Sequence, residues 1–416
     1  MTPDDLILIS VDDHVVEPPD MFEGRLPAAL ADRAPRVVRK DDGSDQWLYE
    51  GREIPNVGLN AVAGRPPAEY GVDPTSFAEI RQGAYLVDHR IDDMNANGVL
   101  ASMNFPSFPQ FCGQMFSNSQ DKELGLAVLR AWNDWHIEDW CGSHPGRFIP
   151  LGLIPYWDPE LMAAEVRRLA ALGCHAVTWS ENPEKLGVPS YHNPHWDPFW
   201  AACEETGTVV CIHIGSSGSV AITSMEAPIT TMLTLTAVGI FQTAGDLLWS
   251  PVLDRFPKLR FMLSEGGTGW IPYFLERADY VYRNHRVWTG SDFGDQLPSE
   301  RFRERFITCF IDDAADILQR KRMIETLHDL HRAQRLFAGI AERQSGLGAP
   351  VQIRRDRDIT VGRETLREIA HRAVHAENLM QDDDGAPIWL LRERRVGVEG
   401  EALAAAVDLK RTAHHE

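Results

Sequence analysis

Residues 196–213 read Trp-Asp-Pro-Phe-Trp-Ala-Ala-Cys-Glu-Glu-Thr-Gly-Thr-Val-Val-Cys-Ile-His, and this stretch holds the unit from which the fold can be predicted. Asp197 and Pro198 are typical of the first turn of a helix, and Gly207 is typical of a helix end. The apolar run Thr208–His213 is typical of a buried strand. The stretch therefore predicts one helix–strand unit, as found where parallel strands are covered by helices.

The same unit occurs again upstream and, more loosely, downstream. Asp158 and Pro159 predict the start of a helix over Glu160–Leu172, Gly173 its end, and Ala176–Trp179 a strand. A third copy has a short helix after Ser250 and Pro251. The remaining predicted strands, together with that of the third copy, are Leu6–Val11, Val99–Asn104, Phe148–Leu153, Leu259–Leu263 and Phe306–Ile311.

Seven strands of parallel type separated by helices favour an α/β fold, a closed eight-stranded (β/α)8 barrel. A doubly wound open sheet is the alternative, but no Gly-x-Gly-x-x-Gly follows the first strand and no Walker-type loop occurs, so its nucleotide-binding forms lose support. Residues 18–90, rich in Pro and Gly, are expected to be an insertion between strands one and two, a hairpin and loops that could cover a substrate.

Composition limits the classes of function. The chain has 416 residues, a formal net charge of −20 and 44% hydrophobic residues, as expected for a globular protein. The negative charge disfavours binding to nucleic acid or to a membrane surface. We find no run near the roughly 18 apolar residues of a membrane span and no basic leader, so we expect a cytoplasmic protein. Six cysteines without a Cys-x-x-Cys spacing predict reduced, mostly buried thiols.

The last quarter of the chain has a different composition. Residues 1–310 hold 24 Lys and Arg against 42 Asp and Glu, whereas residues 311–416 hold 17 against 19. After Phe310 the only aromatic residues are Phe337 and Trp389, so this region has few large apolar side chains to bury. We therefore expect a barrel domain over 1–310 and an atypical region over 311–416 that closes the barrel or is appended to it.

Polar side chains follow the first predicted strand. Asp12 and His14 point the same way in an extended segment and can converge on one ion, and Glu17 is near enough to be a supporting acid. A strand-to-loop turn with a capping Asp and a solvated His explains Asp12 and His14 about as well.

Other strands also end in polar groups. His213 ends a very apolar strand, so it is either a satisfied core histidine or a metal ligand at the barrel mouth, and the Gly/Ser loop after it favours the ligand. Glu265 is followed by two glycines that let the backbone approach a ligand, although pairing with an Arg is an alternative. Asp312 and Glu181 follow two further strands, and Trp179 is expected to wall the pocket with aromatic residues of the insertion.

Convergence of these groups at one barrel face is the plan of a metal-dependent enzyme. Oxygen and nitrogen donors without thiolate suggest zinc, manganese or another divalent ion that can polarise a carboxylate or carbonyl and activate water. We expect Asp12, His14, His213 and Glu265 to be ligands. His213, Glu265 and Asp312 are the expected catalytic residues, with Glu265 serving as ligand or proton-transfer group.

At these residues the sequence resembles the amidohydrolase-related (amidohydrolase 2) family, which includes the aminocarboxymuconate semialdehyde, γ-resorcylate and 5-carboxyvanillate decarboxylases. The resemblance covers about three quarters of the chain. It is carried by Ile9–Pro19, Met103–Phe108, Gly173–Pro183, Cys211–Ser217, Leu263–Gly267 and Ile307–Asp313.

The resemblance implies a distorted TIM barrel with one divalent ion. The first-strand ligand pair of the family corresponds to Asp12 and His14, and the strand-five ligand to His213. The strand-six position, often His in the family, is Glu265 here, which keeps a ligand or acid–base group but departs from the pattern of the hydrolytic members.

The sequence departs most from the family at strand eight. Family members carry there an Asp, ligand or general base, followed by Tyr/Phe-Pro-His, and no such string follows Asp313. The nearest strand-like piece is Arg335–Ile340. Glu342 and Asp329 are candidate substitutes, though a solvated helix face explains either more simply. We therefore expect a C-terminal quarter incomplete at strand eight through divergence, recombination or a frame shift.

The leading hypothesis is a metal-dependent hydrolase or non-oxidative decarboxylase acting on a small carboxylated or cyclic substrate. The alternative is a catalytically impaired barrel that binds a ligand or only assembles, because the strand-eight Asp is missing. Family members are often oligomers, and the apolar segments Trp249–Leu253 and Trp270–Phe274 suit a homodimer or higher homo-oligomer, although core burial explains them equally well.

Overall fold

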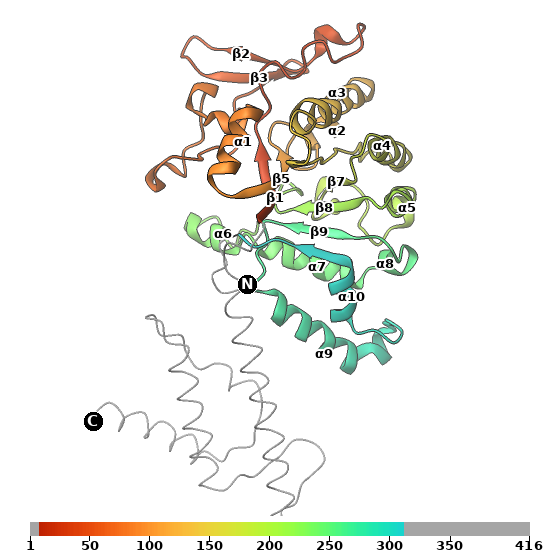
Figure 1. The fold of residues 1–416 in the computed structure, drawn as a ribbon. Coiled ribbons are helices and arrows are strands. Elements are labelled where there is room, and N and C mark those ends of the chain that lie inside the picture. Colours follow the sequence, from red (N-terminus) through yellow and green to blue (C-terminus); the bar gives the residue numbers. More distant parts are fainter. Residues whose placement is uncertain (1–7, 312–416) are drawn as a thin grey trace, which may run out of the picture. The chain divides into compact units, whose positions relative to one another are not determined.

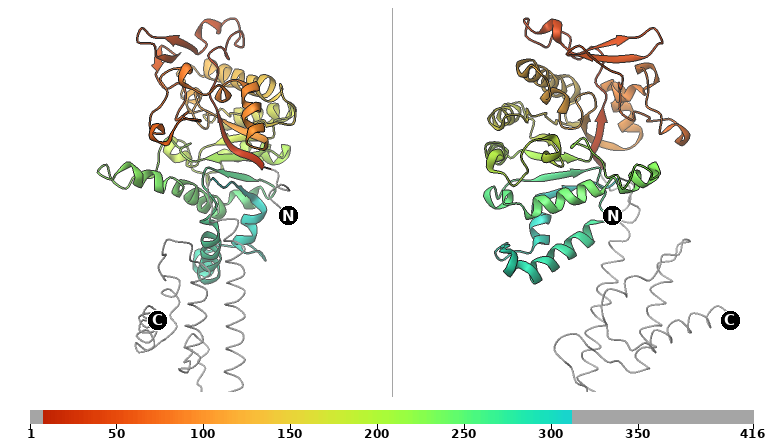
Figure 2. Two further views of the ribbon diagram at one scale, coloured as in Figure 1. Left: turned by 60° about the vertical axis from the view of Figure 1, so that its left-hand side comes forward. Right: turned by 180° about the vertical axis from the view of Figure 1, so that it is seen from behind.

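A computed structural model of the chain describes residues 8–311 (Figures 1 and 2). Seven of its strands are parallel and form two sheets, in the orders β1-β5-β6 and β10-β9-β8-β7. An isolated parallel bridge between Gly152 and Val177 joins the two sheets between β6 and β7. The parallel strands are β1 (Leu8–Val15), β5 (Val99–Pro106), β6 (Phe148–Ile149), β7 (Ala176–Trp179), β8 (Val209–His213), β9 (Phe261–Ser264) and β10 (Phe306–Thr308).

This order confirms an α/β fold built on parallel strands, each next to the one that precedes it in this series. Within residues 8–311 the outer strands β1 and β10 are not hydrogen-bonded to each other, so the array is open between them. The piece that we predict for strand eight, Arg335–Ile340, lies outside the described residues, as does the whole C-terminal region. Closure of the barrel therefore stays a prediction.

The two faces of the strands carry separate apolar clusters. Side chains alternate along a strand, so Val210 and Ile212 of β8 pack in the larger cluster under the helices, whereas Cys211 faces the other way. Cys211 belongs to a small inner cluster to which five strand segments contribute: Met103, Phe105, Leu151, Ala176, Cys211 and Met262. Across this interior, Ser264 Oγ of β9 donates to Val11 O of β1 at 3.5 Å. The strands therefore curve around a common inside.

Helices follow most strands, and α3, α4, α5 and α8 lie along one side of the strand array (Figures 1 and 2). The predicted helix after Asp158 is α4, and the Asp158 carboxylate caps it by accepting from Glu160 N and Leu161 N. The helices are α1 (Val87–Ala96), α2 (Gln114–Ser117), α3 (Lys122–Trp135), a π-helical turn (His136–Cys141), α4 (Pro159–Ala171), α5 (Asp197–Thr206), α6 (Ile229–Leu235), α7 (Val238–Trp249), α8 (Val252–Arg255), α9 (Ile271–Thr289) and α10 (Pro298–Arg305).

Strand bounds match the predictions closely for some strands and less well for others. The Ala176–Trp179 strand is found as predicted, and β8 begins one residue later than expected. The Phe148–Leu153 strand is shorter than predicted because Pro150 lacks the N–H that would continue the ladder. All six cysteines are free and buried, as predicted.

Residues 16–86, between β1 and α1, contain a small antiparallel sheet. Its strands are β2 (Arg36–Arg39), β3 (Asp45–Tyr49) and β4 (Arg52–Ile54), in the order β2-β3-β4. Trp47 of β3 is fully buried and stacks on Phe108, at 4.3 Å between ring centroids. This contact ties the small sheet to the loop after β5.

One stretch of the described residues, Ile229–Trp249, is long and apolar enough to cross a membrane by length and composition alone. It comprises α6 and α7, and 28% of its most apolar window is buried. Ile240 and Leu247 of this stretch belong to the main core. The burial of its second half is that of an ordinary core helix.

Candidate metal centre

The first strand carries Asp12 and His14 to the site. The pairing of β1 with β5 shifts register between Ser10 and Asp13, so the strand bulges where Asp12 lies. Arg90 of α1 fastens this bulge from the other side: Nη1 donates to Asp13 Oδ2 at 2.6 Å and Nη2 donates to His14 O at 2.7 Å. Asp13 is thus paired with a guanidinium, while Asp12 and His14 face the interior.

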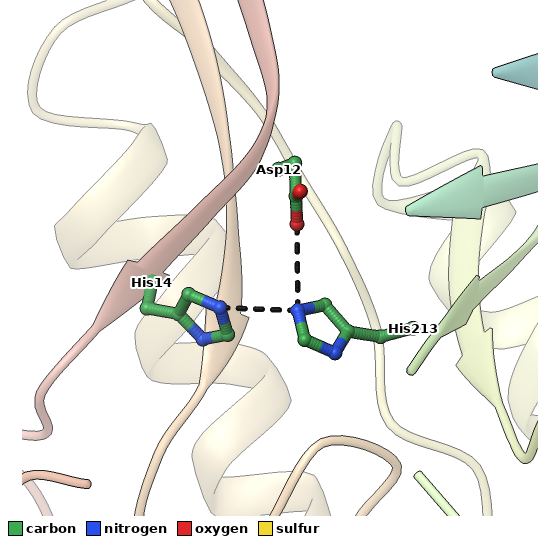
Figure 3. A group of neighbouring side chains, drawn as sticks. All are labelled: Asp12, His14 and His213. Atoms are coloured by element: carbon green, nitrogen blue, oxygen red, sulfur yellow. Dashed lines mark hydrogen bonds and ion pairs between the residues drawn. The ribbon is translucent and has the colours of Figure 1, made fainter. Parts of the chain in front are cut away.

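His213 ends β8 and points to the same place (Figure 3). Its Nε2 lies 3.1 Å from His14 Nε2 and 3.4 Å from Asp12 Oδ1. Its Nδ1 lies 2.6 Å from Ile214 O, and because a carbonyl only accepts, Nδ1 carries the proton of this bond. In the neutral ring Nε2 is therefore the bare nitrogen that faces Asp12 and His14.

These three residues have the donor set of a cation site. Each offers one ligand atom, and all three atoms lie within 4.8 Å of one another. Asp12 Oδ1 is buried and has no hydrogen-bond partner among the described residues, which is costly unless something else satisfies it. One carboxylate and two imidazoles suit zinc or manganese. The residues present therefore fit a divalent ion.

The protonation of the three groups also suits a cation. Burial, with the charge of His213, lowers the pKa of His14 to about 4, so this imidazole is neutral near pH 7. Burial raises the pKa of Asp12, but the interactions of its carboxylate with His213 and His14 outweigh burial and lower the pKa overall. Burial lowers the pKa of His213, and Asp12 and Glu265 raise it further than burial lowers it. The site attracts positive charge.

Glu265 lies beside the three residues. Its Oε2 is 3.1 Å from His213 Nε2, and its side chain is 43% exposed. The residue directly follows β9 in a left-handed conformation (φ 56°), which is uncommon for a residue with a side chain. Burial, partly offset by His213, raises the pKa of Glu265. The predicted strand-six group is thus next to the site and accessible.

Glu17 is buried beside the loop after β5 and accepts hydrogen bonds from the backbone of that loop. Its carboxylate accepts from Phe108 N at 2.7 Å, Ser107 N at 3.2 Å and Trp132 Nε1 at 2.9 Å. Burial raises the pKa of Glu17 to about 7.

Three further residues that the sequence analysis assigns to the site are not found beside Asp12, His14 and His213 in the described structure. Trp179 is fully buried on the helix side of β7, against Trp196 and Phe199, because its neighbour Thr178 takes the inward direction. The expectation that Trp179 walls the pocket is corrected accordingly. Glu181 lies behind the loop that follows His213, with its carboxylate hydrogen-bonded to Gly215 and Ser217. Asp312 lies outside the described residues.

Three neighbours of the site were not predicted from the sequence. The rings of Phe105 and Phe111 lie 4.8 and 4.4 Å from that of His213 by centroid, and Phe111 is only partly buried. Cys309 Sγ donates to Asp12 Oδ2 at 3.6 Å. Burial raises the pKa of Cys309 to about 12, so it is a neutral thiol donor. Only the tertiary fold brings these residues to Asp12 and the histidines.

Comparison with known proteins identifies the family of the chain. The sequence model of the amidohydrolase family matches residues 85–324, more than half of the chain. The chain belongs to the amidohydrolase family. This confirms the family resemblance that the strand-end motifs predict.

Individual relatives are more distant. A γ-resorcylate decarboxylase of Rhodococcus jostii (strain RHA1) is 26% identical over 253 residues, which cover 58% of this chain and 70% of that enzyme. An amidohydrolase of Mycobacterium avium subsp. paratuberculosis K-10 has a similar fold, with a TM-score of 0.57, 22% identity, and coverage of 76% of this chain and 85% of its own. A 5-carboxyvanillate decarboxylase of Novosphingobium aromaticivorans DSM 12444, solved with bound manganese, has a TM-score of 0.48, 18% identity, and coverage of 74% and 80%.

Proposed function

We propose that this amidohydrolase is a metal-dependent hydrolase or non-oxidative decarboxylase that acts on a small carboxylated or cyclic substrate. The observation that carries the proposal is the convergence of Asp12, His14 and His213, with a buried Asp12 oxygen that has no hydrogen-bond partner within residues 8–311. The γ-resorcylate decarboxylase relative supports a carboxylated substrate. The net charge of −20 and the absence of a nucleotide-binding loop disfavour nucleic acid and nucleotides as ligands.

Each residue has one task in this proposal. Asp12, His14 and His213 hold one divalent ion, zinc or manganese, through the carboxylate and the two Nε2 atoms. A divalent cation bound there supplies Lewis-acid polarisation of an oxygen of the substrate or of water. Phe111, partly buried against both imidazoles, offers a ring face to a flat substrate.

Glu265 is the proton-transfer group. Its raised pKa and its accessible side chain suit a carboxyl that holds a proton and then gives it up. In a decarboxylation the bond between the ring carbon and the carboxylate breaks, CO2 leaves, and the electron pair remains on the carbon. The proton of Glu265 then forms the new C–H bond. In a hydrolysis the same carboxylate takes a proton from water.

Metal binding tests the proposal directly. The chain is stripped with a chelator, and Zn²⁺ or Mn²⁺ is added back in a calorimetric titration. We expect one ion per chain, and we expect His213→Ala and Asp12→Asn to abolish saturable binding. His89→Ala is the matched control, because His89 is exposed on α1.

The outcomes separate the hypotheses. Absence of one-to-one binding in the unmodified chain, or binding that survives His213→Ala, contradicts the proposal, and the second result makes His213 a core histidine. Metal binding without turnover of any dihydroxybenzoate or related carboxylated aromatic favours the alternative of an impaired barrel. Glu265→Gln is expected to bind metal and to lose turnover.

A further inference from the structure

A buried carboxylate lies behind the loop that follows His213. Glu181, directly after β7 and Ser180, is only 5% exposed, and its Oε1 accepts from Gly215 N at 2.9 Å and from Ser217 Oγ at 2.8 Å. Neither bond involves a metal ligand. The carboxylate therefore joins the end of β7 to the loop after β8.

A second connection runs through Ser216 to the same loop. Glu181 N donates to Ser216 Oγ at 2.8 Å, and Ser216 Oγ donates to His213 O at 2.5 Å. Between these anchored points stands Ile214, whose carbonyl accepts the His213 Nδ1–H. Gly215 has a positive φ of 73°, so this turn has a specific shape that Glu181 holds from behind. The orientation of the Ile214 carbonyl depends on that shape.

Helix α7 holds Glu181 in turn. Thr243 Oγ1 donates to Glu181 O at 2.8 Å. A Cβ on Gly239 would lie 2.6 Å from Glu181 Oε2, so the absence of a side chain at Gly239 makes room for the carboxylate. Glu181 Oε2 is buried and has no hydrogen-bond partner among the described residues.

We propose that Glu181 is a positioning residue: it fixes the turn Ile214–Gly215 so that the Ile214 carbonyl keeps the proton of His213 on Nδ1 and leaves Nε2 bare toward Asp12 and His14. The consequence for metal affinity rests on the proposed function. The consequence for the His213 tautomer does not, because it concerns the metal-free chain. Outer-sphere partners that orient a metal-binding His in this way typically change metal affinity about 10–100-fold.

The tautomer of His213 is measured by ¹⁵N NMR of the metal-free full chain labelled at histidine, at a pH high enough that the ring is neutral, with the resonance assigned by its loss in His213→Ala. Glu181→Ala removes both bonds to the loop, and the pocket lined by Glu181, Gly215 and Gly239 admits water to the freed groups, so the chain is expected to fold. We expect the Nδ1–H form in the unmodified chain and a mixture of both tautomers in Glu181→Ala. Glu181→Gln keeps one oxygen acceptor and is expected to restore the Nδ1–H form.

Two further variants make the test specific. Glu184→Ala, at an exposed acid of the same segment, is expected to leave the tautomer unchanged. Gly239→Ala is expected to reproduce Glu181→Ala from a different element, because its Cβ displaces the carboxylate. If Glu181→Ala keeps the Nδ1–H form of His213, the inference is overturned, whether or not the chain binds metal. If the tautomer shifts while the unmodified chain binds no metal, the inference stands and the proposed function fails.

Discussion

The pH dependence of stability is predicted to change when Glu17 becomes glutamine. Glu17 is fully buried, and burial raises the pKa of its carboxyl from 4.5 to about 7. Its carboxylate accepts from Trp132 Nε1 and from the backbone N–H groups of Ser107 and Phe108, which only partly offset the cost of burying the charge. Near neutral pH the ionised Glu17 carboxylate therefore lowers the stability of the folded chain.

The sign follows from the two pKa values. The folded state binds the proton more tightly than the unfolded state, so the contribution of Glu17 to stability is most favourable below pH 4.5 and is lost as the pH rises toward 7. At about 1.36 kcal/mol per pH unit between the two pKa values, the full loss is about 3 kcal/mol. Most of it, about 2.5 kcal/mol, falls between about pH 5 and about pH 8.

Urea unfolding of the unmodified chain and of Glu17→Gln, each at about pH 5 and about pH 8, measures this effect. The glutamine loses one acceptor at any pH, which is a constant cost. We expect the unfolding free energy of Glu17→Gln, relative to the unmodified chain, to rise by about 2.5 kcal/mol between the two pH values. Glu23→Gln, at an exposed position, is the control. A difference that is the same at both pH values would refute the reasoning.

Three further predictions concern the site and its support. Arg90→Lys removes the forked contact with Asp13 and His14 O and is expected to weaken Zn²⁺ binding about 10–100-fold in calorimetry; unchanged affinity would contradict the role of Arg90. Burial lowers the pKa of His136 to about 3, so the contribution of the neutral ring to stability is lost as the pH falls from 6.5 toward 3. We therefore expect the stability of His136→Phe to depend less on pH in this range than that of the unmodified chain, as followed by circular dichroism during acid unfolding. Because Asp12 and Glu265 raise the pKa of His213, protons compete with the metal for this side chain. The apparent metal affinity should therefore fall as the pH is lowered in chelator-competition titrations, and an affinity that does not change with pH counts against His213 as a ligand.

Local patterns were sufficient for the helix–strand units. Asp158 with Pro159 marked the start of α4, and the apolar run up to His213 marked β8, because capping and burial act over a few neighbouring residues. Strand lengths were less predictable where a single backbone group ends the ladder of hydrogen bonds, as the missing N–H of Pro150 does. Pairing of β6 with β7 depends there on one bridge at Gly152, which no sequence period reveals.

The site divides in the same way. The proximity of Asp12, His14, His213 and Glu265 could be predicted from the sequence, because parallel strands bring their carboxyl ends to one side of the fold. Trp179 was misplaced because the direction of one side chain at a strand end depends on the local register. Phe111 and Cys309 could not be found, because their nearness to the histidines and to Asp12 arises from loops and from the curvature of the strand array.

The sequence by itself determined the order of strands and helices, the polar residues at the strand ends and, through its motifs, the family. Only the tertiary structure reveals that His213 Nδ1 faces the Ile214 carbonyl and that Asp13 pairs with Arg90. It also reveals that Asp12 Oδ1 has no hydrogen-bond partner among the described residues and that Glu181 is hydrogen-bonded to the loop after His213. The physical reason is the separation along the sequence of the residues that interact. Secondary structure follows from contacts between near neighbours, whereas protonation and ligand direction depend on groups up to 199 residues apart, such as His14 and His213, that only the packed fold brings within hydrogen-bond distance.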